Sequence, residues 1–115
     1  MMKNFNIESY LISDYLLVSC LLNGETLSWE ESKIKILSSR AANHVSNIRK
    51  IIGNFNCIKN EAVNTMDSYY EQYKLNKEFK QEFQDLKMQY ESNAKFIKRF
   101  NKKMEKISSS RKEIR

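Results

Sequence analysis

Large, mostly apolar side chains recur at steps of three and four residues over most of the chain, in two runs on either side of residue 76. The spacing is the heptad repeat of a coiled-coil seam, which predicts long helices that pack along a narrow stripe and supercoil left-handedly. The first run reads Ile34, Leu37, Ala41, His44, Ile48, Ile51, Phe55, Ile58 and Ala62, and the second reads Phe83, Leu86, Tyr90, Asn93, Ile97, Phe100, Met104 and Ile107, with Arg111 and Ile114 in phase.

The polar interval around Asn76 separates the two runs and is the best place for a turn. A hairpin would let the chain bury its own stripe, so we expect helices at 29–73 and 78–113 that pack antiparallel. A single bent helix is the alternative. At a rise of about 1.5 Å per residue, the two arms would be roughly 65 Å and 50 Å long.

Gly53 lies inside the first run, and Gly53-Asn54 is the only point at which that helix could break. A glycine inside a helix costs about 1 kcal/mol relative to alanine, which a long helix tolerates. Because Ile48, Ile51 and Phe55 keep the phase of the seam across Gly53, we favour a continuous helix over a break.

The segment 7–22 is apolar on nearly all sides and predicts a short helix that other parts of the chain must cover. The dipeptide Asn23-Gly24 supplies residues that commonly end a helix. Ser28 and Glu31 then have the spacing of a capping box, so we expect the long helix to begin just after Ser28.

The composition agrees with a helical fold. The chain has 115 residues, of which two are glycine and none is proline, so it has few residues that favour tight turns. Hydrophobic residues make up 41% and charged residues 30%, which suits helices that bury one stripe. The predicted fold class is all-α: an antiparallel two-helix coiled-coil hairpin with a short apolar N-terminal helix, in a single domain spanning residues 1–115.

Positive charge gathers toward the C-terminal end of a chain whose formal net charge is +6. Such a stripe can bind an acidic protein surface, nucleic acid or anionic lipid, or it can simply form the solvated face of the second helix. The basic residues there are Lys95, Lys98, Arg99, Lys102, Lys103, Lys106, Arg111, Lys112 and Arg115.

No catalytic or metal-binding pattern is present in the sequence. His44 is the only histidine, and it falls at a seam position where a polar side chain sets the register of packed helices. Cys20 and Cys57 match no zinc-ligand or disulfide spacing. We therefore expect a non-enzymatic cytoplasmic protein without a cofactor or metal. The apolar part of segment 7–22 is shorter than the roughly 20 residues that span a bilayer, so membrane contact would be peripheral.

Aromatic residues provide two further candidates. Tyr69, Tyr70 and Tyr73 cluster near the expected turn, at a helical spacing that indicates packing rather than stacking on nucleic-acid bases. Tyr70 falls off the seam and is the best candidate for an exposed protein contact, because tyrosine is enriched at interface hot spots. Trp29 is expected to anchor segment 7–22 against the long helix, and a pocket for a partner is the alternative.

Two stretches resemble the FliJ-like stalk proteins of flagellar and virulence type III secretion systems, including their SpaM/InvI-type members. The first stretch runs from residue 37 to residue 74 and ends in a Tyr-x-x-x-Tyr-Lys signature, and the second is the basic stretch 96–107. The resemblance implies an antiparallel coiled coil that acts as the central stalk of a hexameric secretion ATPase. It also implies links to an export gate protein and to chaperones, at the cytoplasmic face of a membrane secretion apparatus.

If the resemblance holds, one group of side chains would contact the ATPase and Tyr70 would contact the gate or a chaperone. Two alternatives stay open. One is a secretion chaperone or another small helical interaction bundle, which would bury segment 7–22 with Gly53 as a true break. The other is a basic helical protein that binds nucleic acid, although the sequence contains no nucleic-acid recognition motif. We expect no small-molecule substrate. The side chains expected at the ATPase are Arg40, Lys98, Arg99, Lys102, Lys103 and Lys106.

Overall fold

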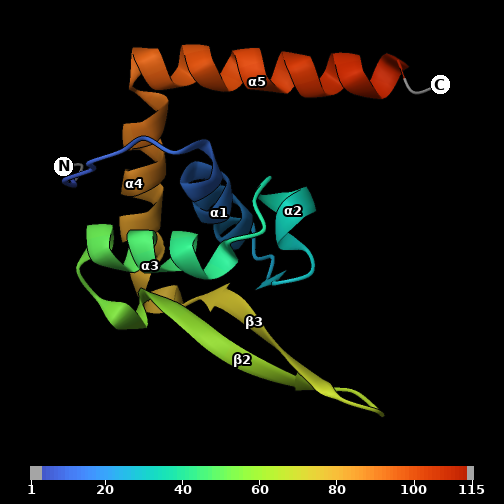
Figure 1. Ribbon diagram of the computed structural model, residues 1–115. Coiled ribbons are helices and arrows are strands. Elements are labelled where there is room, and N and C mark those ends of the chain that lie inside the picture. The colour runs from blue at the N-terminus through green and yellow to red at the C-terminus, as the bar shows by residue number, and fades with distance from the viewer. Residues whose placement is uncertain (1–3, 114–115) are drawn as a thin grey trace.

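Helices and short strands alternate along the chain (Figure 1). The computed structural model describes residues 4–113, with side chains as far as Ser109. Ile114 of the expected seam therefore lies outside the described residues. In chain order the elements are α1 (Ile12–Leu22), β1 (Leu27–Ser28), α2 (Ser32–Lys35), α3 (Ala41–Ile52), the 3-10 turn η1 (Phe55–Cys57), β2 (Ile58–Asn64), β3 (Tyr69–Leu75), the 3-10 turn η2 (Lys77–Phe79), α4 (Lys80–Glu91) and α5 (Ala94–Glu113).

The prediction of an all-α hairpin is wrong. The chain is 58% helical and 15% strand, and its strands form one antiparallel sheet in the order β1-β3-β2. Neither predicted long helix exists, because 29–73 holds two helices and two strands and 78–113 is divided between α4 and α5. The longest dimension of the molecule is 47 Å, well below the roughly 65 Å expected of the first arm. Ile34, placed on the seam by its spacing, is 79% exposed.

Gly53 breaks the first predicted helix, so the expectation of continuity was wrong. It follows α3 with a φ of 83° and bonds its backbone N–H to the Arg49 carbonyl. Glycine adopts this left-handed conformation readily because it has no Cβ, and it commonly ends helices in this way. The shared phase of Ile48 and Phe55 was a coincidence of spacing, since Ile48 is buried whereas Phe55 is 70% exposed.

A β-hairpin occupies the region expected to end the first helix. β2 and β3 pair in a register that sets Ile58 opposite Leu75 and Asn64 opposite Tyr69. At the tip, the Thr65 N–H donates to the Ser68 carbonyl at 2.7 Å. The tyrosines of β3 favour strands as well as helical seams, because aromatic side chains pack well on a pleated surface.

Asn76 connects the sheet to the second half of the chain, but it is not the turn of a helical hairpin. Its backbone is extended, with φ −76° and ψ 117°. Its side-chain amide donates to the Asn56 carbonyl at 2.9 Å and accepts from the Glu78 N–H at 3.2 Å. The residue thus fastens β3 to η1 and starts η2.

The expectations for the N-terminal segment are confirmed in part. α1 lies within the predicted range 7–22, and Gly24 follows it with a φ of 83°. The Ser28 N–H and hydroxyl both donate to the Glu31 carboxylate, at 3.1 Å and 2.9 Å. The helix that follows Ser28, however, is the short α2.

The core lies between α1, α3 and α4, and α5 is attached at one end. In Figure 1, α5 crosses the end of the molecule opposite the β2–β3 hairpin. Tyr15 from α1 packs edge-on against Phe96 and Phe100 from α5, with ring centroids 5.2 Å apart in each case. Fully buried side chains of the core include Leu17, Val18, Leu21, Val45, Ile48, Phe83, Leu86, Tyr90 and Phe96. Each contributes about 1.5–3 kcal/mol by leaving water.

Candidate functional site

One continuous stretch of the chain carries positive charge and no carboxylate. Residues 32–60 contain no aspartate or glutamate, while they include Lys33, Lys35, Arg40, Arg49, Lys50 and Lys59. This stretch spans α2, α3, η1 and the start of β2. The formal charge of this stretch is therefore positive, although the chain carries 14 acidic residues elsewhere.

The helix α3 divides sharply into a buried and a polar face. Ala41, Val45, Ile48 and Ile52 are buried. The opposite face carries residues at steps of three, one and three, which places them on one line along the helix. This α3 polar face consists of Asn43, Ser46, Asn47 and Lys50, of which Asn47 is half-exposed and the others are exposed.

A tight turn joins α2 to α3 and sets the direction of α3. Leu37 lies in this turn with a φ of 59°, the only positive φ at a non-glycine residue in the part of the chain that the structure describes. A left-handed leucine costs roughly 1–2 kcal/mol, so the surrounding packing must hold it. The exposed Arg40 precedes the first turn of α3, where no side chain caps the free N–H groups.

A hydrogen-bonded chain of three side chains holds α3 against α1 and the turn. His44 Nδ1 lies 2.6 Å from Asp14 Oδ1, and His44 Nε2 lies 2.9 Å from Ser38 Oγ. Asp14 is 1% exposed. Burial raises the pKa of the Asp14 carboxyl above its usual value, while the bonds from His44 and Asn47 act in the opposite direction. The prediction that His44 sets packing between helices agrees with this position, although the helices concerned are α1 and α3.

Arg49 fastens the other flank of α3 to the hairpin. Its guanidinium donates to the Ile58 carbonyl at 2.6 Å and to Asn60 Oδ1 at 2.8 Å. The same group lies 3.9 Å from the centre of the Phe55 ring, a cation–π contact. These bonds fix the position of β2 relative to α3, so the helix and the hairpin form one surface.

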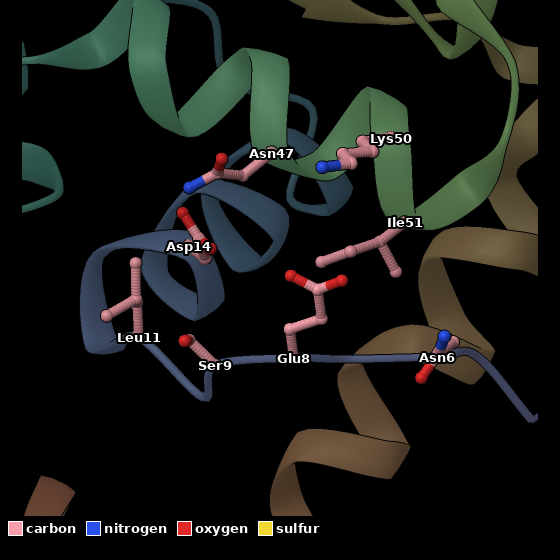
Figure 2. A pocket seen from close by; sticks show the side chains of 8 residues that line it. All are labelled: Asn6, Glu8, Ser9, Leu11, Asp14, Asn47, Lys50 and Ile51. Atoms are coloured by element: carbon pink, nitrogen blue, oxygen red, sulfur yellow. The ribbon is translucent and has the colours of Figure 1, made fainter.

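A cavity of about 280 Å³ lies beside the α3 polar face, between α3 and the segment that precedes α1. Figure 2 shows Asn47, Lys50 and Ile51 lining it from α3, with Asp14 from α1. The Glu8 side chain extends into the same cavity from the segment before α1 (Figure 2). A carboxylate thus shares this cavity with Lys50, one of the exposed cations of α3.

The residues predicted as partner contacts do not come together. Arg40 lies at the start of α3, next to the α3 polar face. Tyr70 is 43% exposed on β3. The five others lie on α5 at the opposite end, where Arg99 donates to the Tyr10 carbonyl and its guanidinium lies 5.8 Å from the centre of the Phe96 ring. The remaining four, Lys98, Lys102, Lys103 and Lys106, are exposed on α5.

Sequence reasoning missed the α3 polar face. Asn43, Ser46 and Asn47 are uncharged and lie between the predicted seam positions, so they were not selected as candidate contact residues. The signal that could have found them is the absence of carboxylates from residues 32–60.

The order Ser38, His44, Asp14 is also that of a hydrolase triad. However, neither Ser38 nor His44 lines the cavity beside α3 or another pocket found in the described part of the chain. Among residues 4–113, no group of three or more His, Cys, Asp or Glu side chains could hold a metal ion. In the same range, no helix has the length and apolar character needed to cross a bilayer.

Comparison with known proteins identifies no relative. Neither the protein-family models, nor the curated proteins, nor the solved structures contain a match to this chain.

Proposed function

We propose that this protein binds double-stranded DNA, with α3 in the major groove and the β2–β3 hairpin beside it. The elements run α1-β1-α2-α3-β2-β3 with the sheet order β1-β3-β2, which is the arrangement of a winged helix-turn-helix domain. Topology alone does not define a function. The observation that carries the proposal is the α3 polar face, which is exposed and lies in a stretch without carboxylates.

The side chains of this face have the chemistry that reads base edges. Asparagine can bond in bidentate fashion to adenine, lysine or arginine to guanine, and serine to several bases. Asn43, Ser46 and Asn47 supply such groups on one stripe along α3. A helix with its side chains is about 10–12 Å across, which fits the roughly 12 Å width of the major groove.

The positioning contacts support the same function. A recognition helix must be held rigidly, because base contacts depend on the register of the helix in the groove. The Asp14–His44–Ser38 chain holds one flank of α3 and the Arg49 bonds hold the other. The polar face between these two flanks stays open to solvent.

The stalk function implied by the resemblance stays an untested prediction. It was built on a rod of paired helices, and the described chain has no such rod. We therefore prefer DNA binding, which was the second alternative drawn from the sequence, and we move the expected contact from the basic tail to α3.

The test is fluorescence anisotropy of a labelled mixed-sequence duplex titrated with the full chain. Arg40, Lys50 and Lys59 are the exposed cations nearest the proposed interface. If three phosphates are neutralised, the slope of log K against log salt is about −2.7, and the affinity falls about 40-fold between about 50 and 200 mM salt.

Matched variants locate the interface. Lys50→Gln and Lys98→Gln remove the same charge, the first from α3 and the second from α5. We expect Lys50→Gln to weaken binding several-fold more than Lys98→Gln and to reduce the salt slope by about 1. The reverse order would assign binding to α5, and the absence of any salt-dependent binding would refute the proposal.

A further inference from the structure

A groove of about 880 Å³ lies between residues 26–31, which precede α2, and β3, and none of its lining residues belongs to α3. Its lining includes exposed aromatic rings and carboxylates, and it contains no lysine, arginine or histidine. We call it the aromatic groove. It is defined by Trp29, Tyr69 and Tyr70, together with Glu30, Glu31 and Glu71.

The aromatic side chains of this groove are unusually accessible. Trp29 is 71%, Tyr69 67% and Tyr70 43% exposed. The expectation that Trp29 anchors the N-terminal helix is wrong, because a side chain buried against α1 would not be solvated to this degree. Because Tyr69 and Tyr70 are consecutive residues of β3, their side chains lie on opposite faces of the strand. Exposed aromatic residues of this kind are frequent at binding sites.

The carboxylates give this surface a negative charge. Glu31 is paired with Lys35 at 3.0 Å, and the bond from Lys35 is the main cause that lowers the pKa of Glu31. Within the part of the chain that the structure describes, Glu30 and Glu71 have no ion pair. Aromatic faces next to free carboxylates bind lysine and arginine side chains well, through cation–π and ionic contacts together.

The helix α5 carries the opposite chemistry. Phe100, Met104 and Ile107 lie on one stripe of α5, and the last two are half-exposed and do not belong to the core cluster. The opposite face of α5 carries a row of exposed cations, while Glu105 is the one acidic residue between 94 and 109. The row consists of Lys95, Lys98, Arg99, Lys102, Lys103 and Lys106.

We propose that α5 of one copy docks in the aromatic groove of a second copy. The groove supplies carboxylates and aromatic rings, and the cationic face of α5 supplies lysine and arginine side chains that complement both. Pairing of α5 with α5 would instead set like charges side by side. The groove of the same copy is out of reach, because α5 and the hairpin lie at opposite ends of the molecule (Figure 1). Two copies can each place α5 in the aromatic groove of the other, which gives a closed dimer.

Sedimentation velocity of the full chain without DNA tests this contact independently of the proposed function. At low salt we expect a mass above the 13.7 kDa of one copy. Dissociation is expected at about 1 M salt, where the Debye length is about 3 Å. Trp29 is the only tryptophan, so association should shift its emission to shorter wavelength. A chain that stays at the monomer mass at every concentration overturns the proposal.

Two charge-reversal variants, one of the groove and one of α5, give the decisive test. Glu30→Lys/Glu71→Lys reverses the groove, and Lys102→Glu/Lys103→Glu reverses the helix. Each variant alone should associate at least 10-fold more weakly, with an unchanged far-UV circular dichroism spectrum as the folding control. Their equimolar mixture restores opposite charges at both contacts and should associate again. Undiminished association of either variant alone, or a mixture of folded variants that stays monomeric, would reject this pairing of α5 with the groove.

Discussion

Replacing His44 by leucine tests whether the Asp14–His44 pair holds α3 in place. Asp14 is 1% exposed, and its Oδ1 lies 2.6 Å from His44 Nδ1. Removal of one partner from a buried pair costs about 3–5 kcal/mol, because the other charge is left without compensation. Asn47 still bonds to the Asp14 carboxyl, so we expect a loss of about 3 kcal/mol at neutral pH, at the lower end of that range. Urea denaturation followed by circular dichroism measures it.

The loss should depend on pH, with a sign that follows from Asp14. Burial raises the pKa of Asp14 above 3.8, and His44 counteracts that rise, so the pKa is higher still in the variant. A carboxyl whose pKa is raised by folding favours the folded state while it is protonated, and this contribution is lost as the pH rises through the folded pKa. The Asp14 contribution to the destabilisation of His44→Leu should therefore shrink on acidification, by at most about 1.4 kcal/mol per pH unit.

Two further variants complete this test. Asn43→Leu, one residue earlier on the exposed face of α3, should change the free energy of unfolding by no more than about 0.5 kcal/mol. Asp14→Asn/His44→Leu removes the buried charge and should recover a large part of the stability. A loss below about 0.5 kcal/mol for His44→Leu, or an equal loss in the single and double variants at every pH, would refute the reasoning.

Three other predictions concern the end of α3, the thiols and the segment beside α3. Gly53→Ala should destabilise by about 1 kcal/mol, since φ is 83° and a Cβ would meet nothing within 4 Å; stabilisation in thermal melts would instead support a helix that continues through residue 53. Burial raises the pKa of both Cys20 and Cys57 from 9.0 to about 11. Neither thiol should react with a thiol-specific reagent in the native protein at about pH 8, where about one in a thousand is ionised. Stability should hold up to about pH 9 and fall between about pH 9 and 11, by about 2–3 kcal/mol per thiol; fast native labelling or a flat alkaline profile would contradict this. Glu8→Gln removes the carboxylate that lines the same cavity as Lys50, so DNA affinity in the anisotropy assay should rise about two- to threefold, and an unchanged or lower affinity would count against the interface.

Local signals in the sequence were sufficient to place α1 and the Ser28–Glu31 cap, but not to predict β1 or the short length of α2. The apolar character of segment 7–22, the Asn23-Gly24 stop and the Ser28–Glu31 pair act within a few residues, and the structure contains all three. Gly53 was misjudged because the apolar spacing around it matched a heptad. Its left-handed backbone depends on where β2 must go, which is tertiary information.

The β2–β3 hairpin could not be read from local pattern. Tyr69 and Tyr73 are four residues apart, a spacing that suits one face of a helix and equally places both on the same side of a strand. The strand forms because β3 pairs with β2 on one edge and with β1 on the other. Strand stability comes from such pairing and burial more than from intrinsic preference.

For the candidate interface, the sequence indicated cations but not their arrangement. Arg40 was selected as a partner contact and does lie beside the α3 polar face. The lysines of α5 were grouped with it by charge, yet they lie at the other end of the molecule (Figure 1). Uncharged residues that could contact bases, such as Asn43, can be identified only once the buried side of α3 is known.

An NMR titration of isotope-labelled protein with duplex DNA tests the central claim most directly, because it reports on each residue separately. We predict that the amide signals of Asn43, Ser46, Asn47 and Lys50 shift, together with those at the hairpin tip, and that the signals of α5 stay in place. Shifts confined to α5, or no shifts at low salt, would contradict the assignment of α3 as the DNA-binding helix.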